Sequence, residues 1–444
     1  MNKTSAPGFF ITTLGCQMNE HDSEKIAGLL EAAGYVEVSE MAGAKFILFN
    51  TCCVRENPEN KLYGRLGEVK RLKEADPGII VAVCGCMVQQ SVERDKLEQA
   101  YPYVDLIFGT HNLHRLPELL LKVEAGERVI EVWDEAREEA EGVPTKRADN
   151  LKAWVNITYG CDNFCSYCIV PYVRGRCRSR QLDQVLTEIN DLVNQGFREV
   201  TLLGQNVNAF GKDLTPPVDF ADLLAEVNKI PDLWRIRFTT SHPRDVNDKM
   251  IASLAELDKV CEHLHLPLQS GSTEILRRMN RGYSSDDYLR LVEKIKTAVP
   301  DISLTTDIIV GFPGETDEDF AETMRVVNEV KYDSAFTFVY SPRVGTPAAK
   351  MQNQVSEEVK KERIMHLVEV QKEISTKANQ DYLGRIVEVL VEGPSKTDSK
   401  VLASRTRTNK LVHFPGSADL IGKLVEVKII EATPWTLHGE VLTR

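Results

Sequence analysis

The sequence predicts an α/β protein in three parts: an N-terminal open parallel sheet, a central incomplete (β/α)6 barrel and a small C-terminal β-barrel. Three observations support this prediction. Short apolar runs alternate with amphipathic helical stretches in the first part of the chain. Repeated strand-and-helix units then follow in the central part. From residue 383 onward, short alternating segments with interspersed Gly and Pro replace the helical pattern.

The composition is that of an ordinary globular protein. The 444 residues are 42% hydrophobic and 27% charged, which excludes a wholly disordered chain and a small scaffold stapled by disulfides. The longest strongly apolar stretch, residues 78–87, is shorter than a membrane span. The N-terminus lacks the basic start and apolar middle of a secretory signal. We therefore expect a cytoplasmic protein that does not enter a membrane.

The N-terminal part predicts a parallel sheet. Apolar runs at residues 9–14, 45–50 and 79–83 have the character of buried strands, and amphipathic segments at 22–33 and 57–74 separate them. Strands that alternate with helices form parallel sheets, in which all carboxyl ends lie at one edge. We expect ligands to bind at that edge.

A charged, apolar-poor segment at residues 134–150 predicts a linker. It separates an N-terminal domain, residues 1–133, from a central domain, residues 151–380, and a C-terminal domain covers residues 381–444. The predicted strands of the central domain are residues 153–158, 199–203, 235–240, 263–268, 303–310 and 335–340. The predicted helices are residues 181–195, 221–230, 285–298, 318–330 and 356–380. Such a barrel would have its active site at the carboxyl ends of the strands.

The net charge argues against nucleic-acid binding over the whole surface. Lys and Arg total 54 against 66 Asp and Glu, a net charge of −12, so the molecule as a whole repels a polyanion. The C-terminal domain differs, with nine basic and eight acidic residues. Its predicted strands are residues 386–391, 400–403, 411–414, 424–429 and 437–442. Arg405, Arg407 and Lys410 in this domain would bind a phosphate backbone or form an ordinary solvated face, and composition favours neither.

The most specific motif is a run of three cysteines, Cys161, Cys165 and Cys168, with the spacing Cys-x3-Cys-x2-Cys. A reducing compartment disfavours structural disulfides. A zinc site normally has a fourth Cys or His close by, which this run lacks. Three thiolates on one short loop instead match a [4Fe-4S] cluster with one iron left open for substrate. The alternative is three incidental thiols, although the loop follows a predicted strand at a position where sites form.

A second set of three cysteines is spread along the N-terminal domain. Cys16, Cys52 and Cys86 each come just after a predicted strand, so the parallel sheet would bring them to one edge. The alternative is that each is a small buried core residue, which is common for cysteine. Three at equivalent turns favour a second three-thiolate site. For the remaining cysteines we favour core or incidental positions: Cys53, Cys84, Cys177 and Cys261.

The cysteine run before a predicted barrel resembles the radical S-adenosylmethionine (SAM) superfamily, and the rest of the chain resembles its methylthiotransferase branch. The resemblance covers nearly the whole length and includes both cysteine sets and a C-terminal domain similar to the TRAM domain. It also includes residues 171–175, 203–208, 240–244, 266–272 and 307–315. Residues 204–208 (Gly-Gln-Asn-Val-Asn) and 405–410 (Arg-Thr-Arg-Thr-Asn-Lys) are most similar to the members that act on dimethylallyl-adenosine in tRNA.

The resemblance implies SAM and two [4Fe-4S] clusters as cofactors. Cys161, Cys165 and Cys168 would hold the cluster that binds SAM, and Cys16, Cys52 and Cys86 would hold an auxiliary cluster that carries the sulfur to be transferred. The residues expected to line the cofactor are Tyr167, Gly204, Gln205, Gln269 and Gly311. Four arginines would share one face if their segment is extended, either as a solvated edge or to hold tRNA or a cofactor carboxylate: Arg174, Arg176, Arg178 and Arg180.

The implied activity is a sulfurtransferase reaction, methylthiolation at C2 of N6-dimethylallyladenosine at tRNA position 37. No classical acid or base is implied, because this C–H bond is not acidic and a radical is needed to open it. The implied partners are tRNA, an electron donor of the flavodoxin or ferredoxin type and a sulfur donor of unknown identity, and we expect a monomer. The alternatives are threonylcarbamoyl-adenosine in tRNA as substrate, an aspartate of a ribosomal protein as substrate, or a non-catalytic iron–sulfur protein that binds RNA.

Overall fold

The computed structural model describes residues 6–53, 56–135 and 142–442, so residues 136–141 of the predicted linker lie outside the described residues. The chain divides into two compact units. The first extends to Asn150 and also contains Trp154–Asp162 and Cys168–Arg178, and the second contains the remaining residues up to Arg444. Both short segments of the first unit border the loop that carries the cysteine run.

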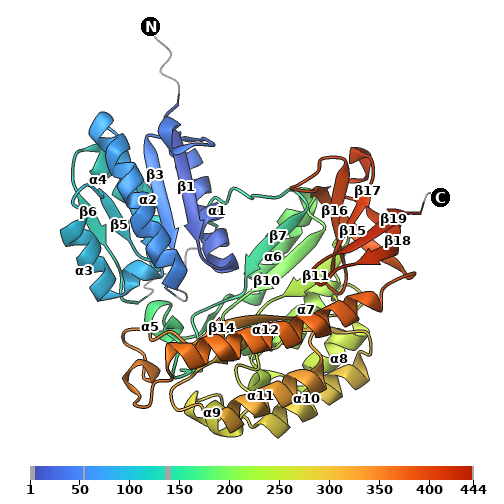
Figure 1. Ribbon diagram of the computed structural model, residues 1–444. Coiled ribbons are helices and arrows are strands. Elements are labelled where there is room, and N and C mark those ends of the chain that lie inside the picture. Colours follow the sequence, from blue (N-terminus) through green and yellow to red (C-terminus); the bar gives the residue numbers. More distant parts are fainter. Residues whose placement is uncertain (1–5, 54–55, 136–141, 443–444) are drawn as a thin grey trace. The chain divides into compact units, whose positions relative to one another are not determined.

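The first unit is built on a parallel six-stranded sheet of order β2-β1-β3-β4-β5-β6 (Figure 1). Its strands are β1 (Gly8–Leu14), β2 (Val36–Glu37), β3 (Phe46–Thr51), β4 (Ile80–Gly85), β5 (Leu106–Phe108) and β6 (Val129–Glu131). The three predicted strands correspond to β1, β3 and β4, and the parallel pairing confirms the predicted sheet.

Helices cover both faces of this sheet. They are α1 (Gln17–Ala32), α2 (Glu56–Ala75), α3 (Ser91–Ala100) and α4 (Leu116–Glu124). Phe46 and Leu48 of β3 share a core with α1 and α4, whereas Ile47 and Phe49 share a core with α2 and α3. This alternation is that of a strand whose side chains point to opposite faces, both of which are buried. The carboxyl edge of the sheet is therefore the place where side chains can reach a ligand.

The six predicted strands of the central domain form two three-stranded sheets of order β11-β10-β7 and β12-β13-β14. The strands are β7 (Lys152–Asn156), β10 (Glu199–Leu203), β11 (Arg235–Phe238), β12 (His263–His265), β13 (Ser303–Val310) and β14 (Ser334–Val339). Two short strands, β8 (Thr158–Tyr159) and β9 (Arg178–Ser179), pair with each other. A parallel bridge between Ile236 and Val260 links β11 to the segment before β12, which is the continuity expected of an open barrel.

Helices separate these strands. They are α5 (Val170–Val173), α6 (Leu182–Asn194), α7 (Phe220–Asn228), α8 (Asp248–Glu256), α9 (Thr273–Arg278), α10 (Ser285–Ala298), α11 (Asp317–Val330) and α12 (Glu357–Gln380). Capping boxes begin α10 at Ser284 and α11 at Thr316, which satisfies backbone N–H groups that the helix leaves unpaired. The long helix α12 lies along β14 (Figure 1). Among the helices of the described chain, none has both the length and the apolarity to cross a membrane.

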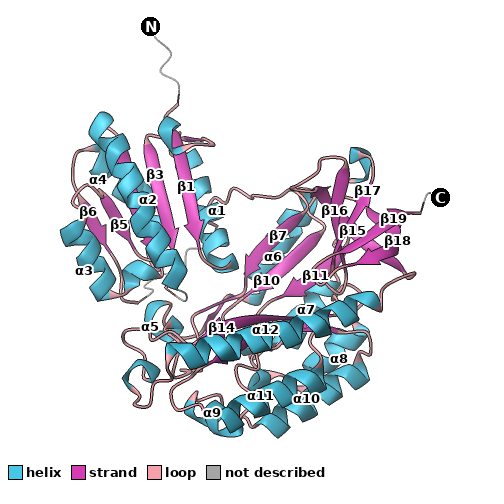
Figure 2. Ribbon diagram, viewed as in Figure 1, coloured by secondary structure: helices cyan, strands magenta, loops and turns pink. Residues whose placement is uncertain are grey.

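The C-terminal part of the second unit is a closed five-stranded barrel of order β15-β16-β17-β19-β18 (Figure 2). Its strands are β15 (Ile386–Pro394), β16 (Val401–Thr406), β17 (Leu411–Pro415), β18 (Leu424–Ala432) and β19 (Leu437–Val441). Val389, Val412, Phe414 and Val427 fill its interior. Closure leaves no exposed sheet edge, and the predicted β-barrel is confirmed.

Candidate functional site

The loop that carries the cysteine run is tied down at its start. The backbone N–H of Cys161 donates to the carbonyl oxygen of Gly175 (3.1 Å). Gly160, at φ +75°, lies so close to the segment of Gly175 and Arg176 that a Cβ atom would approach the carbonyl oxygen of Arg176 to 2.1 Å. Only glycine fits this left-handed and crowded position. The local backbone therefore holds the cysteine run in one place.

The turn that follows α9 binds the middle of the same loop. The N–H of Ser166 donates to the carbonyl oxygen of Met279 (3.0 Å), and the Ser166 hydroxyl donates to that of Arg278 (2.8 Å). The side-chain amide of Asn280 donates to the carbonyl oxygen of Phe164 (3.0 Å). These bonds come from a segment more than a hundred residues away in sequence and fix the backbone on both sides of Cys165.

The buried, positively charged guanidinium of Arg281 contacts the sulfur of Cys165. Its Nη1 donates to the sulfur of Cys165 (3.3 Å), its Nη2 to the carbonyl oxygen of Pro267 (3.1 Å) and its Nε to the hydroxyl of Tyr283 (3.0 Å). Only 4% of Arg281 is exposed. A buried charge is costly unless an opposite charge accompanies it. Arg281 is thus a feature that the sequence did not indicate.

The second cysteine set lies along one edge of the N-terminal sheet. In neighbouring strands, Leu14 is in register with Thr51, and Thr51 with Gly85. Cys16 follows this row by two residues, and Cys52 and Cys86 follow it by one. The predicted convergence of three βα turns is therefore present in the backbone. Cys52 and Cys86 are buried and Cys16 is exposed.

Cys86 is surrounded by polar partners. The thiol of Cys53 and Nε of Arg174 (3.1 Å) hydrogen-bond to its sulfur, while Nη2 of Arg174 binds the buried carboxylate of Asp22 (2.8 Å). The Cys53 hydrogen bond and the Arg174 guanidinium lower the pKa of Cys86 to about 6 despite its burial. The thiolate is the form of cysteine that binds metal, and this environment favours the thiolate of Cys86.

The predicted row of four arginines does not form. Arg174 follows α5 in helical conformation and Gly175 then turns the chain at φ +75°, so the segment is not extended. Arg174 is buried, whereas Arg176 is exposed and pairs with Asp162 (3.3 Å). Arg180 is buried against Glu188 (2.6 Å). The prediction was wrong because alternation in sequence gives one face only in an extended strand.

The remaining cysteines have the positions expected of core or incidental residues. Cys84 and Cys261 are buried, and burial raises the pKa of both thiols. Cys177 is partly exposed. Cys53 is buried in a cluster with Ile169 and Val173, and its thiol also hydrogen-bonds to Cys86. In the described part of the chain, no three His, Cys, Asp or Glu side chains meet at a point where one metal ion would bind, but in a cluster each thiolate binds a different iron.

Several residues predicted to line the cofactor lie just past the ends of the barrel strands. Gly204 directly follows β10 and Gly311 directly follows β13. Gln269 is buried and has a left-handed backbone, with φ +69°. Its backbone N–H donates to the carbonyl oxygen of Asp307 in β13 (2.8 Å). Tyr167 and Ile309 both pack against a buried apolar cluster that contains Met279 and Phe312. Gln205 is partly exposed beside Gly204.

Glu315 holds the turn that contains Gly311. Its carboxylate accepts hydrogen bonds from the N–H groups of Gly311 and Phe312, the latter at 3.2 Å, and lies 3.4 Å from Nη1 of Arg363. Burial raises the pKa of Glu315 to about 7, and it outweighs the attraction of Arg363. Sequence reasoning found the turn but not this side chain as its support.

We predict a pH-dependent stability term from Glu315. Because its pKa is raised from 4.5 to about 7, the folded protein keeps a proton that the unfolded chain releases within this window. The contribution of Glu315 to the free energy of unfolding is fully present below pH 4.5. It falls by about 3 kcal/mol as the pH rises through 7. Denaturant unfolding from acidic to mildly alkaline pH should show that Glu315→Gln removes this loss. The control is Glu318→Gln at an exposed position, and parallel pH curves for wild type and Glu315→Gln would contradict the prediction.

His242 marks the loop after β11. Its N–H donates to the side-chain oxygens of Asn206 (3.3 Å) and Asn208 (3.1 Å), and its Nδ1 accepts from the N–H of Arg244 (3.3 Å). Burial, with Arg281 and Arg244 nearby, lowers the pKa of His242 to about 2. The ring is therefore neutral, with its proton on Nε2. The two asparagines of the Gly-Gln-Asn-Val-Asn segment thus position the β11 loop.

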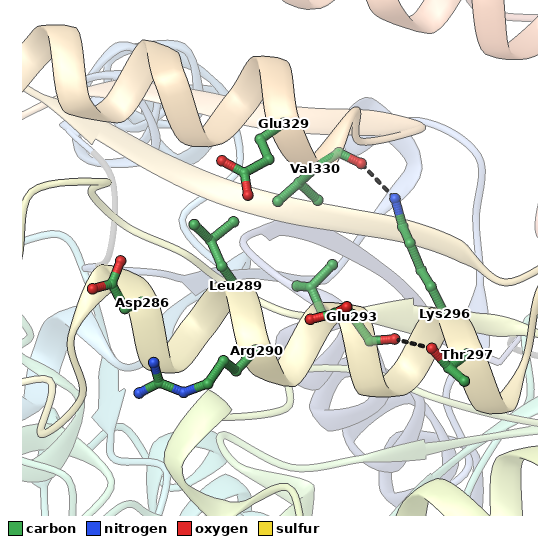
Figure 3. Close-up of a pocket in the computed structure, with 9 residues that line it drawn as sticks. Asp286, Leu289, Arg290, Glu293, Lys296, Thr297, Glu329 and Val330 are labelled. Carbon is green, nitrogen blue, oxygen red and sulfur yellow. Dashed lines mark hydrogen bonds between the residues drawn. The ribbon is translucent and has the colours of Figure 1, made fainter.

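A groove between α10 and the end of α11 lies in the helical layer (Figure 3). The ammonium of Lys296 donates to the carbonyl oxygen of Val330 (2.5 Å), and the Thr297 hydroxyl donates to that of Glu293 (2.8 Å). In both hydrogen bonds the acceptor is a backbone carbonyl oxygen of a helix. The first accepts at the end of α11, where the last carbonyl groups of the helix have no partner within it. The groove is lined by these helices, not by residues at the strand ends, and we assign it no role in the candidate site.

The three basic residues predicted to contact RNA all carry ion pairs. Arg407 binds Glu262 with two nitrogens (2.7 and 2.8 Å), and Lys410 binds Asp333 (2.5 Å). Arg405 lies 3.2 Å from Glu392 of the barrel itself. Glu262 and Asp333 belong to the central domain, so two of the three residues help to fix the barrel to it.

Two buried arginines of β11 complete this junction. Arg235 donates to the carbonyl oxygen of Arg405 (2.7 Å) and pairs with Glu388 (2.9 Å). Arg237 donates to the carbonyl oxygens of Arg407 (2.9 Å) and Thr406 (2.8 Å). It also pairs with the buried Glu199 (3.1 Å). The barrel is thus docked on the central strands through its backbone.

Family models match three parts of the chain. The Radical SAM superfamily matches residues 155–327, Uncharacterized protein family UPF0004 matches residues 8–109, and the TRAM domain matches residues 380–442. With the fold and the cysteine run, these matches define a radical SAM protein with an added N-terminal sheet domain and a C-terminal TRAM barrel.

Curated relatives match the whole length. Proteins named tRNA-2-methylthio-N(6)-dimethylallyladenosine synthase are 56% identical in Alkaliphilus oremlandii (99% of this chain, 94% of the relative) and 55% identical in Acetivibrio thermocellus (98% and 91%). The relative from Carboxydothermus hydrogenoformans is 56% identical (97% and 98%). The chain belongs to the tRNA-2-methylthio-N(6)-dimethylallyladenosine synthase family.

Solved structures share the fold at low identity. The radical SAM methyltransferase TsrM from Kitasatospora setae, with cobalamin and a [4Fe-4S] cluster bound, has a TM-score of 0.56 at 15% identity over 78% of this chain and 74% of that chain. The cobalamin-dependent radical SAM enzyme OxsB has a TM-score of 0.53 at 14% identity over 84% and 56%. These likenesses support the fold alone.

Proposed function

We propose that this protein methylthiolates C2 of N6-dimethylallyladenosine at position 37 of tRNA, using SAM and two [4Fe-4S] clusters. The observation that carries the proposal is the presence of two three-cysteine sets in a chain that matches the synthases over its full length. One set has radical SAM spacing, and the other lies at one edge of the N-terminal sheet. The proposal also includes a monomer in the cytoplasm and a flavodoxin- or ferredoxin-type electron donor.

The residues fit iron–sulfur clusters. Three thiolates outweigh the positive charge of the iron–sulfide core, so a cluster is an anionic group. Cys165 has the buried guanidinium of Arg281 on its sulfur, and Cys86 has that of Arg174. In this proposal Cys161, Cys165 and Cys168 hold one cluster and Cys16, Cys52 and Cys86 hold the other.

In this proposal the side chains of the protein bind the cofactors and position the loops around them. The bound cluster and SAM supply a carbon-centred radical, which can remove hydrogen from a C–H bond of no useful acidity. The turn after α9 fixes the loop of Cys165, and Glu315 fixes the Gly311 turn. In this proposal Gln269 and Tyr167 line the cofactor, and neutral His242 holds its proton on Nε2 at the β11 loop. No side chain is asked to abstract a proton.

The C-terminal barrel is proposed to contribute to tRNA binding. Of its three candidate residues, Arg405 has the most exposed side chain, at 34%, against 26% for Arg407 and 10% for Lys410. Its guanidinium, 3.2 Å from Glu392, is the one most open to solvent and can exchange its partner for a phosphate. Arg405 is therefore the first residue to test.

We predict that Arg405→Gln lowers the salt dependence of tRNA binding. Losing one phosphate contact should reduce the slope of log affinity against log salt by about one. The matched variant is Lys410→Gln, whose ammonium is held by Asp333; it should lower the melting temperature and leave the slope unchanged. Binding titrations at several salt concentrations measure both, and equal slopes for Arg405→Gln and wild type would remove Arg405 from the interface.

The function is tested by mass spectrometry of nucleosides. Dimethylallylated tRNA is incubated anaerobically with the reconstituted protein, SAM and a reductant, then digested. A 2-methylthio derivative is the expected product. If 5′-deoxyadenosine forms without it, the radical chemistry stands and the substrate is wrong; threonylcarbamoylated tRNA and a ribosomal-protein aspartate are then tested. If no 5′-deoxyadenosine forms, the protein is an RNA-binding iron–sulfur protein and the proposal fails.

A further inference from the structure

Arg281 carries a buried charge that no carboxylate of the described residues accompanies. Its three hydrogen-bonded partners are the sulfur of Cys165, the carbonyl oxygen of Pro267 and the hydroxyl of Tyr283. No Asp or Glu of the described residues forms an ion pair with it. The other buried arginines discussed above are each paired with a carboxylate: Arg174 with Asp22, Arg180 with Glu188, Arg235 with Glu388, Arg237 with Glu199 and Arg363 with Glu315.

Clamping the loop does not require this charge. The oxygens of Pro267 and Tyr283 can also accept hydrogen bonds from a neutral amide. The loop is already held by Ser166 and Asn280 through bonds that do not involve Arg281. A buried guanidinium without a counter-charge opposes folding, so its presence indicates that an anion belongs beside it in the loaded protein.

The position of that anion follows from the geometry. Nη1 of Arg281 is 3.3 Å from the sulfur of Cys165, a residue of the radical SAM cysteine run. A cluster held by three thiolates is anionic, and it gains a further negative charge when it is reduced. A nearby cation stabilises the reduced form more than the oxidised form, which raises the reduction potential.

We propose that Arg281 is the built-in counter-ion of the cluster on Cys161, Cys165 and Cys168 and raises its reduction potential. The inference rests on the proposed cluster at these cysteines. It assigns Arg281 a redox role that is separate from holding the loop. Arg174 offers the internal comparison, because Asp22 already compensates its charge, so its effect on the cluster at Cys86 should be smaller.

The test is a potentiometric titration followed by electron paramagnetic resonance. The parent is the full-length chain with Cys16, Cys52 and Cys86 replaced by Ala, so that one cluster contributes the signal, and no SAM is added. Arg281→Gln should shift the potential to more negative values by at least a tenfold change in the equilibrium constant, which is about 59 mV for one electron. Arg281→Lys keeps the charge and should restore most of the parental value.

Controls separate the charge from packing. Arg277→Gln changes an exposed arginine of α9, the helix that precedes Arg281, whose partner is Glu274, and should leave the potential unchanged. Equal potentials for Arg281→Gln and parent overturn the inference, as does an equal shift in Arg281→Gln and Arg281→Lys. In a separate binding titration with SAM, a change in SAM affinity without a change in potential also overturns it and makes Arg281 a SAM ligand. If the parent binds no iron, the proposed cluster has failed instead.

Discussion

Cys165→Ala is expected to reduce the formation of 5′-deoxyadenosine to the background rate. Its thiolate is one of only three in the cysteine run, and the loss of one leaves an iron without its ligand. Chromatographic detection of 5′-deoxyadenosine after anaerobic incubation with SAM and a reductant measures the effect. Cys161→Ala and Cys168→Ala should behave in the same way.

The matched variants are in the other cysteine set. Cys16→Ala, Cys52→Ala and Cys86→Ala should retain part of the SAM cleavage while losing sulfur insertion into tRNA, because the two sets have separate roles in the proposal. Circular dichroism checks that each variant is folded. Equal loss of cleavage in both sets, in folded protein, would contradict two distinct roles. Cys177→Ala, outside both sets, should keep both activities.

Arg237→Met is expected to lower the free energy of unfolding by about 3–5 kcal/mol. The variant leaves the carboxylate of Glu199, whose side chain is 3% exposed, buried without a counter-charge. It also removes the donor to the carbonyl oxygen of Arg407 and one of two donors to that of Thr406, which keeps its bond from the N–H of Asn409 (3.0 Å). The midpoint of thermal unfolding should fall by about 10 °C, and limited proteolysis should release the C-terminal barrel sooner.

Lys428→Met is the control for this change. Lys428 is exposed on β18 of the same barrel, and removing an exposed charge has little effect on stability. Its melting temperature should stay close to that of wild type. An unchanged melting temperature in Arg237→Met would show that the junction does not depend on this residue.

Periodicity was enough to predict the long elements. The strand prediction at residues 199–203 and the helix prediction at 285–298 match β10 and α10 residue for residue. The short strands β2 and β5 were missed because two or three residues show no period. The cysteine sets were found because their spacing carries chemistry, and their role as cluster ligands remains a prediction.

The supporting residues of the candidate site were not predictable in the same way. Arg281 and Cys165 are 116 residues apart in sequence, and nothing near Arg281 distinguishes it from a surface arginine. Glu315 belongs to a recognised segment, but its role depends on burial. Arg174 was singled out for the wrong reason, since the turn at Gly175 removes the extended face that the alternation implied.

The docking of the barrel also bears on how such proteins diversify. Arg235 and Arg237 bind peptide carbonyl oxygens of Arg405, Thr406 and Arg407, and every amino acid supplies a carbonyl oxygen. The hydrogen bonds at positions 405 and 406 therefore do not depend on which side chains these positions carry. These side chains can change during evolution, or the barrel of another chain can be grafted, while the same hydrogen bonds to the central strands are kept. Substrate preference can in this way evolve separately from the chemistry.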